Sequence, residues 1–70
     1  MSVAFSIEFE QEIDGRWIAE VVEVPGVLAY GSTQQQAIAQ VQALALRVVA
    51  DQLEHDEDER EYLDLSLAAA

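Results

Sequence analysis

The sequence predicts a single α+β domain in which an antiparallel sheet packs one face against one long helix, in the order β-β-β-α-β. Three observations indicate it: an alternating apolar segment near the N-terminus, an Asp-Gly turn before a second apolar run, and a long apolar stripe at helical spacing. Because 70 residues suffice for one domain only, we assign residues 1–70 to it. We expect strands at about residues 3–10, 16–24, 27–31 and 62–67, and a helix at about 33–54.

The first strand has the two-residue period of a strand with one buried face. Its apolar residues are Val3, Phe5, Ile7 and Phe9, and between them stand Ala4, Ser6 and Glu8, with Glu10 after them. Asp14-Gly15 then lies between two apolar runs. We expect a hairpin with a primed turn there, because Gly accepts the positive φ that such a turn requires.

The second strand is apolar on both faces. Trp17, Ala19 and Val21 point one way, and Ile18, Val22 and Val24 point the other. One helix cannot cover both faces of a sheet, so the second face is interpreted as a surface for self-association or for a partner. The residues predicted to mediate self-association are Trp17, Ile18, Val22 and Val24.

Pro25-Gly26 ends this strand, and a short third strand leads to the helix. Thr33 is predicted to cap the helix by accepting a hydrogen bond from the N–H of Gln36, whose side chain reaches back. The apolar stripe of the helix consists of Ala37, Ile38, Val41, Leu44, Ala45, Val48 and Leu53. We expect it to pack on the sheet, with Leu46 and Val49 away from its centre.

The segment of residues 54–61 holds six carboxylates and His55. It lacks the ligand spacing of an EF-hand loop, so a solvated loop or helix end is favoured over a calcium site. Leu63, Leu65 and Leu67 then restore the strand period.

The charge excludes some functions. Fourteen acidic residues against three arginines and no lysine give a net charge of −11. Nucleic-acid backbones are bound by cationic side chains, so autonomous nucleic-acid binding is disfavoured and a basic protein partner is favoured. The small core and the absence of cysteine favour a homo-oligomer, a dimer or a tetramer. No leader or membrane segment is evident, which indicates a cytoplasmic protein.

No catalytic motif is present, and no cofactor or metal is expected. His55 has no second histidine or cysteine with which to act. The weakest hypothesis is a metal-dependent nuclease that uses Glu8, Glu10 and Asp64, since solvated strand faces are polar by default.

Several short runs occur in an order that resembles the HicB-like antitoxin family. They are Asp14-Gly15-Arg16-Trp17-Ile18-Ala19-Glu20-Val21, Val24-Pro25-Gly26-Val27, Gly31-Ser32-Thr33 and Gln36-Ala37. The resemblance covers about residues 3–67 and implies a partial RNase H-like fold. It also implies a partner, a small basic HicA-like toxin that cleaves RNA and whose active site the antitoxin covers. We expect no C-terminal DNA-binding module in this chain.

The hypothesis is therefore a non-catalytic interaction domain, a HicB-like antitoxin of a type II toxin–antitoxin system. The residues predicted to contact the toxin are Glu20, Glu23, Asp56, Glu57, Asp58 and Glu59. The alternative is a stand-alone homo-oligomeric scaffold or a small-ligand regulatory domain without a toxin.

Overall fold

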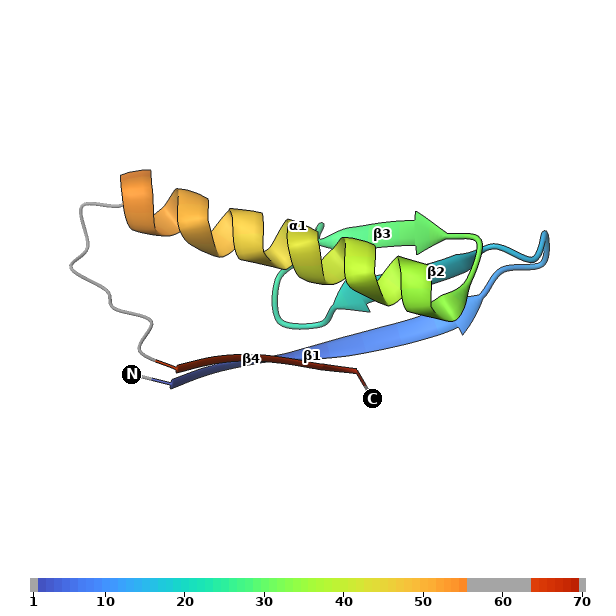
Figure 1. Cartoon of the computed structure of the whole chain (residues 1–70), viewed down its shortest axis with the longest axis horizontal. Helices are drawn as coiled ribbons and strands as arrows, with labels where there is room; N and C mark the ends of the chain where they lie inside the picture. Colours follow the sequence, from blue (N-terminus) through green and yellow to red (C-terminus); the bar gives the residue numbers. More distant parts are fainter. Residues whose placement is uncertain (1, 56–63, 70) are drawn as a thin grey trace.

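The structure is a computed structural model of the chain and describes residues 2–55 and 64–69. Its elements are β1 (Ser2–Gln11), β2 (Trp17–Val21), β3 (Leu28–Gly31), α1 (Gln34–His55) and β4 (Asp64–Ala69). The strands form one mixed sheet in the order β3-β2-β1-β4, and α1 covers one face of it (Figure 1). The predicted α+β class and the order β-β-β-α-β are confirmed.

The β1–β2 hairpin turns through residues 12–16. The N–H of Glu12 donates to the carbonyl oxygen of Arg16 at 2.7 Å, and the N–H of Gly15 donates to that of Glu12 at 2.9 Å. Gly15 has a φ of 94°, while no non-glycine residue in the described part of the chain has a positive φ. The predicted primed turn is therefore wrong, because a type I′ turn needs positive φ at Asp14 too; the loop is longer, with the glycine after the turn.

β2 ends at Val21, earlier than the predicted boundary at residue 24. The chain turns back there. The N–H of Val24 donates to the carbonyl oxygen of Val21 at 3.3 Å, and the N–H of Val21 donates to the carbonyl oxygen of Val27 at 2.9 Å. Gly26 makes the turn possible with a φ of 87°. Val22 and Val24 consequently do not share a strand face with Ile18, as the alternation had suggested.

The start of α1 has the predicted cap. Thr33 Oγ1 accepts the N–H of Gln36 at 3.1 Å, and the Gln36 side chain accepts the N–H and the hydroxyl of Ser32, both at 2.7 Å. Gly31 is required just before the cap, because a Cβ at that position would lie 2.5 Å from the backbone nitrogen of Ala37. β3 and α1 can approach this closely only without a side chain at residue 31.

β4 pairs with β1 in parallel, with Ser2 opposite Asp64 and Ile7 opposite Ala69. The predicted wholly antiparallel sheet is therefore wrong. β3 runs in the same direction as β1, since two antiparallel steps separate them. α1 then carries the chain back along the sheet, so that β4 starts from the same end as β1.

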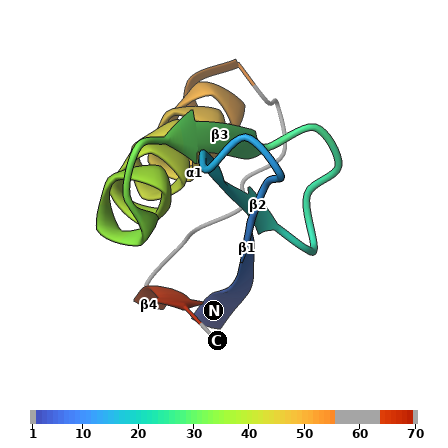
Figure 2. The ribbon, with the colours of Figure 1, turned by 90° about the vertical axis from the view of Figure 1, so that its right-hand side faces the viewer.

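The core lies between α1 and the face of the sheet that α1 covers, here called the inner face. Its buried residues are Ile7, Ala19, Val21, Val27, Ala37, Val41, Ala45 and Val49. Alanine at positions 19, 37 and 45 lets the helix approach the strands closely, and α1 packs mainly on β2 and β3 (Figure 2).

The predicted helix stripe is confirmed except at its far end. Val49 is buried although it was placed away from the centre of the stripe, whereas Leu53 is 48% exposed. Leu53 lies in the last turns of α1, which extend past β2 and β3 (Figure 1). In the described part of the chain, no helix combines the length and the apolar character needed to cross a membrane.

Candidate functional site

The face of the sheet opposite α1, here called the outer face, is the candidate functional site. It is formed by the residues that alternate with the core positions, namely Ala4, Ser6, Glu8 and Glu10 of β1, Ile18 and Glu20 of β2, and Leu28 and Tyr30 of β3. All of them are exposed except Ile18, which is half-buried. No described helix covers this face, so its side chains are available to a partner (Figure 2).

Three carboxylates gather around a shallow hollow on this face. Glu8, Glu10 and Glu20 line it together with Ile18 and Phe9, and its volume is about 180 Å³. The strand register produces the cluster, because Glu8 is directly opposite Glu20 and Glu10 is opposite Ile18. Like charges on directly opposed residues repel each other, which costs the fold some stability.

No ion pair of the described residues includes these carboxylates. Among the described residues, the ion pairs are those of Arg16 with Asp14 and of His55 with Asp51. Neither reaches the hollow. A cationic group from another molecule would therefore relieve a repulsion that the described part of the chain does not compensate.

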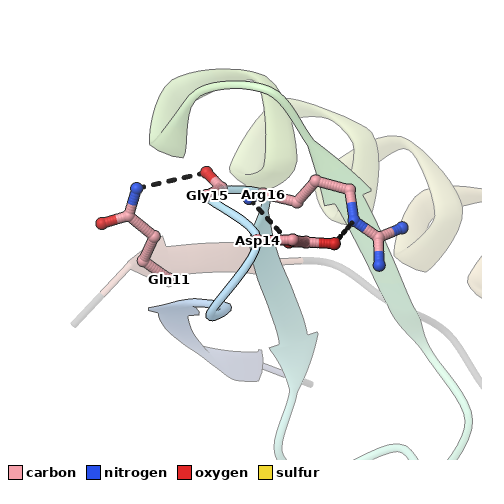
Figure 3. Close-up of polar contacts among 4 residues, drawn as sticks. All are labelled: Gln11, Asp14, Gly15 and Arg16. Carbon is pink, nitrogen blue, oxygen red and sulfur yellow. Dashed lines mark hydrogen bonds and ion pairs between the residues drawn. The ribbon is translucent and has the colours of Figure 1, made fainter.

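The hairpin loop holds Arg16 beside Asp14 (Figure 3), and this places a cation next to Tyr30 of the outer face. Arg16 Nε lies 2.8 Å from Asp14 Oδ2, and the Arg16 guanidinium carbon lies 4.8 Å from the centre of the Tyr30 ring. A hydrogen bond from the backbone N–H of Arg16 lowers the pKa of Asp14, and the guanidinium contributes in the same direction. Gln11 also donates to the carbonyl of Gly15 at 3.2 Å. These contacts connect the two ends of the hairpin loop.

Glu23 has a structural role at the border of the outer face. The N–H of Val22 donates to the carbonyl of Ser6 at 3.0 Å, which continues the β1–β2 ladder by one step. The N–H of Ser6 then donates to Glu23 Oε1 at 2.8 Å, so the carboxylate takes the place of a strand carbonyl. This hydrogen bond lowers the pKa of Glu23.

The four residues predicted for self-association do not share one surface. Ile18 lies on the outer face, but Trp17 and Val24 pack against the core. Trp17 is inward because it alternates with Ile18, and its ring centroid lies 6.3 Å from that of Phe9. Val22 is 51% exposed in the turn after β2.

Of the residues predicted for toxin contact, the two that the structure describes have different surroundings. Glu20 lies at the hollow and Glu23 is held by Ser6. Asp56, Glu57, Asp58 and Glu59 lie outside the described residues. The contributions of Glu8 and Glu10 to one cluster with Glu20 were missed, because the cluster depends on the register between β1 and β2.

The carboxylate set of the nuclease hypothesis is not brought together. Asp64 stands opposite Ser2 at one end of β1. Glu8 is six residues further along the strand, roughly 20 Å away at ~3.3 Å per residue, and Glu10 is further still. Within residues 2–55 and 64–69, no group of three acidic, His or Cys side chains is arranged to hold a metal ion.

Comparison with protein-family models, with curated proteins and with solved structures finds no match for this chain. The outer face and its chemistry therefore carry the functional interpretation.

Proposed function

We propose that the chain is a non-catalytic protein-interaction domain that acts in the cytoplasm as a HicB-like antitoxin. In this proposal it has a partial RNase H-like fold and neutralises a small basic toxin that cleaves RNA. The observation that supports the proposal is the hollow on the outer face, where Glu8, Glu10 and Glu20 meet without a described counter-charge.

The electrostatics favour a basic partner. With a net charge of −11, the chain attracts a cationic protein through the solvent and raises the rate of encounter. At the outer face, an arginine or lysine of the partner gains charge-assisted hydrogen bonds to Glu8 or Glu20. The same field repels RNA, so the antitoxin competes with the substrate for the toxin surface without binding the substrate itself.

The apolar residues next to the hollow supply the contact that charge alone does not. Ile18, Leu28 and Tyr30 lie on adjacent strands, with Ile18 directly opposite Tyr30 and Glu20 opposite Leu28. Protein interfaces combine a desolvated apolar centre with a polar rim, and tyrosine is enriched among the residues that contribute most to affinity. The outer face offers both components side by side.

The test is co-expression with the small basic reading frame next to this gene. We expect the two proteins to co-purify and the chain to restore growth that the toxin arrests. Glu20→Gln should weaken the complex about tenfold, which is ~1.4 kcal/mol, as measured by calorimetric titration. Glu54→Gln changes the net charge equally but lies at the end of α1, so it should leave the affinity within about twofold.

Failure to co-purify, with no restored growth, would overturn the proposal. If Glu20→Gln and Glu54→Gln weaken the complex equally, its affinity depends on the net charge of the chain and not on the outer face.

The second candidate is a stand-alone homo-oligomeric scaffold or a small-ligand regulatory domain with no toxin. It is favoured by the exposure of Leu28 and Tyr30, which are 40% and 45% exposed. The absence of a small basic reading frame beside the gene would select this candidate.

A further inference from the structure

β3 is an edge strand whose outer hydrogen-bonding groups have no described partner. It ends the sheet order β3-β2-β1-β4, opposite to β4. The N–H of Val21 donates to the carbonyl of Val27, and the strand register continues from this pair through Ala19 opposite Ala29. Because the peptide groups of an antiparallel strand face its two neighbours alternately, those of Ala29 face β2. Those of Leu28 and Tyr30 therefore face the open edge.

β3 also lacks the features that usually protect an edge. Natural sheets discourage edge pairing with lysine, proline, bulges or inward-pointing charges. The sequence of β3 is Leu-Ala-Tyr-Gly, which contains no proline, lysine or other charged residue. Its pairing with β2 has one continuous register, without a bulge. Its outward side chains, Leu28 and Tyr30, are large and apolar, and both are partly exposed to solvent.

The charge distribution makes this edge suitable for a second copy of the chain. Residues 24–46, which include β3 and the first half of α1, contain no charged side chain. The other three strands each contain an acidic residue, such as Glu8 in β1, Glu20 in β2 and Asp64 in β4. Two chains of charge −11 repel each other, and β3 adds no charge of its own to this repulsion, while Arg16 beside Tyr30 is paired with Asp14.

We propose that a second copy of this chain binds along β3, so that the two β3 strands pair antiparallel across a two-fold axis that passes beside Ala29. In this register Leu28 of each copy lies opposite Tyr30 of the other. Each such pair exchanges both of its N–H···O bonds, which uses the peptide groups that face the open edge. The result is a continuous sheet that contains the four strands of each copy.

Two independent features select the same register. The backbone requires Leu28 and Tyr30 to be the hydrogen-bonded residues, and the side chains require the exposed Leu28 and Tyr30 to cover each other. A two-fold interface is self-complementary, so each contact occurs twice. The proposal does not depend on the toxin. Glu8, Glu10, Glu20 and Ile18 line a hollow on β1 and β2 that stays accessible in the dimer, and a toxin would meet Leu28 and Tyr30 as pairs beside it.

A cysteine cross-link tests the register. The two Ala29 residues form a non-hydrogen-bonded pair with their Cα atoms about 4.5 Å apart, a separation that a disulfide can span. The chain has no cysteine, so Ala29→Cys introduces the sole thiol. We expect mild oxidation to convert most Ala29→Cys protein to a disulfide dimer. Ser6→Cys, which is exposed on β1, should remain largely monomeric after the same oxidation, as measured on a non-reducing gel.

Sedimentation equilibrium tests the edge itself. We expect the unmodified chain to sediment at twice its mass of 7.7 kDa. Leu28→Pro removes an N–H that faces the edge without removing a bond to β2, so this variant should keep its circular dichroism spectrum and sediment at the mass of one chain. A monomeric unmodified chain, or equal cross-linking by Ser6→Cys and Ala29→Cys, would overturn the proposal, whatever the outcome of the toxin experiment.

Discussion

The inner and outer faces of the sheet are built from alternate residues of the same strands, yet they have opposite chemistry. On β1, Ile7 is buried and its neighbour Glu8 is exposed. On β2, Ala19 is buried and Glu20 lines the hollow. The inner face is closely packed and stabilises the domain, whereas the outer face holds like charges that oppose folding. The difference indicates that the outer face is shaped by something other than the stability of the isolated chain.

The largest expected difference between the faces is at Ile7. Ile7→Ala removes a fully buried side chain from the core and should lower the free energy of unfolding by roughly 2–5 kcal/mol. Glu10→Ala on the outer face of the same strand should change it by about 0.5 kcal/mol or less. Urea denaturation of both variants measures the contrast. Similar losses from the two would contradict the division into faces.

The next effect concerns the close approach of β3 to α1. Gly31→Ala places a Cβ against the backbone of Ala37, which cannot move aside as a flexible side chain would. We expect a loss of roughly 1–3 kcal/mol, as for other overpacked positions. The thermal midpoint should fall accordingly, and an unchanged midpoint would show that the helix shifts without cost.

On the outer face the expected effect has the opposite sign. Glu20→Gln removes the charge directly opposite Glu8, so it should raise the free energy of unfolding by ~0.2–1 kcal/mol at low salt. Added salt should reduce this gain, because it screens exposed charges. Glu54→Gln, at the end of α1, serves as the control of equal charge. A loss of stability in Glu20→Gln would contradict the repulsion inferred at the hollow.

The smallest effect is the pH dependence due to Glu23. Its pKa is lowered in the folded protein from 4.5 by the N–H of Ser6, so its contribution to stability is complete above about pH 4.5. The contribution is lost as the pH falls through the folded pKa. Glu23→Gln keeps an acceptor oxygen for Ser6 and should therefore show a shallower decline in the urea midpoint below that pH. If the urea midpoint of Glu23→Gln declines as steeply with falling pH as that of the unmodified chain, Glu23 does not cause this pH dependence.

The sequence predicts those features that depend on local spacing. The alternation at Phe5, Ile7 and Phe9, the cap at Thr33 and the burial of Val41 all follow from the period of a strand or a helix. They are correct because neighbouring residues and short hydrogen bonds determine them.

The features that were not predicted depend on the path of the chain. Residues 21–24 look like continuous strand, but Val24 turns back to the core because β3 must return beside β2. The parallel pairing of β4 follows from the crossover through α1, which no short segment encodes. Likewise, Glu8 and Glu20 meet only through the register between two strands, so the hollow could not be located from either strand alone.

The pairing of β4 with β1 also has a kinetic consequence. It joins residues that are far apart in the sequence, from Ser2 opposite Asp64 to Ile7 opposite Ala69, so these contacts raise the contact order. The hairpin and the helix consist of nearby residues and form quickly, whereas bringing β1 and β4 together requires a longer conformational search. Until β4 pairs with β1, the backbone N–H and C=O groups on that edge of β1 are unpaired and can bind other unfolded chains. We therefore expect the yield of refolded protein to fall with concentration.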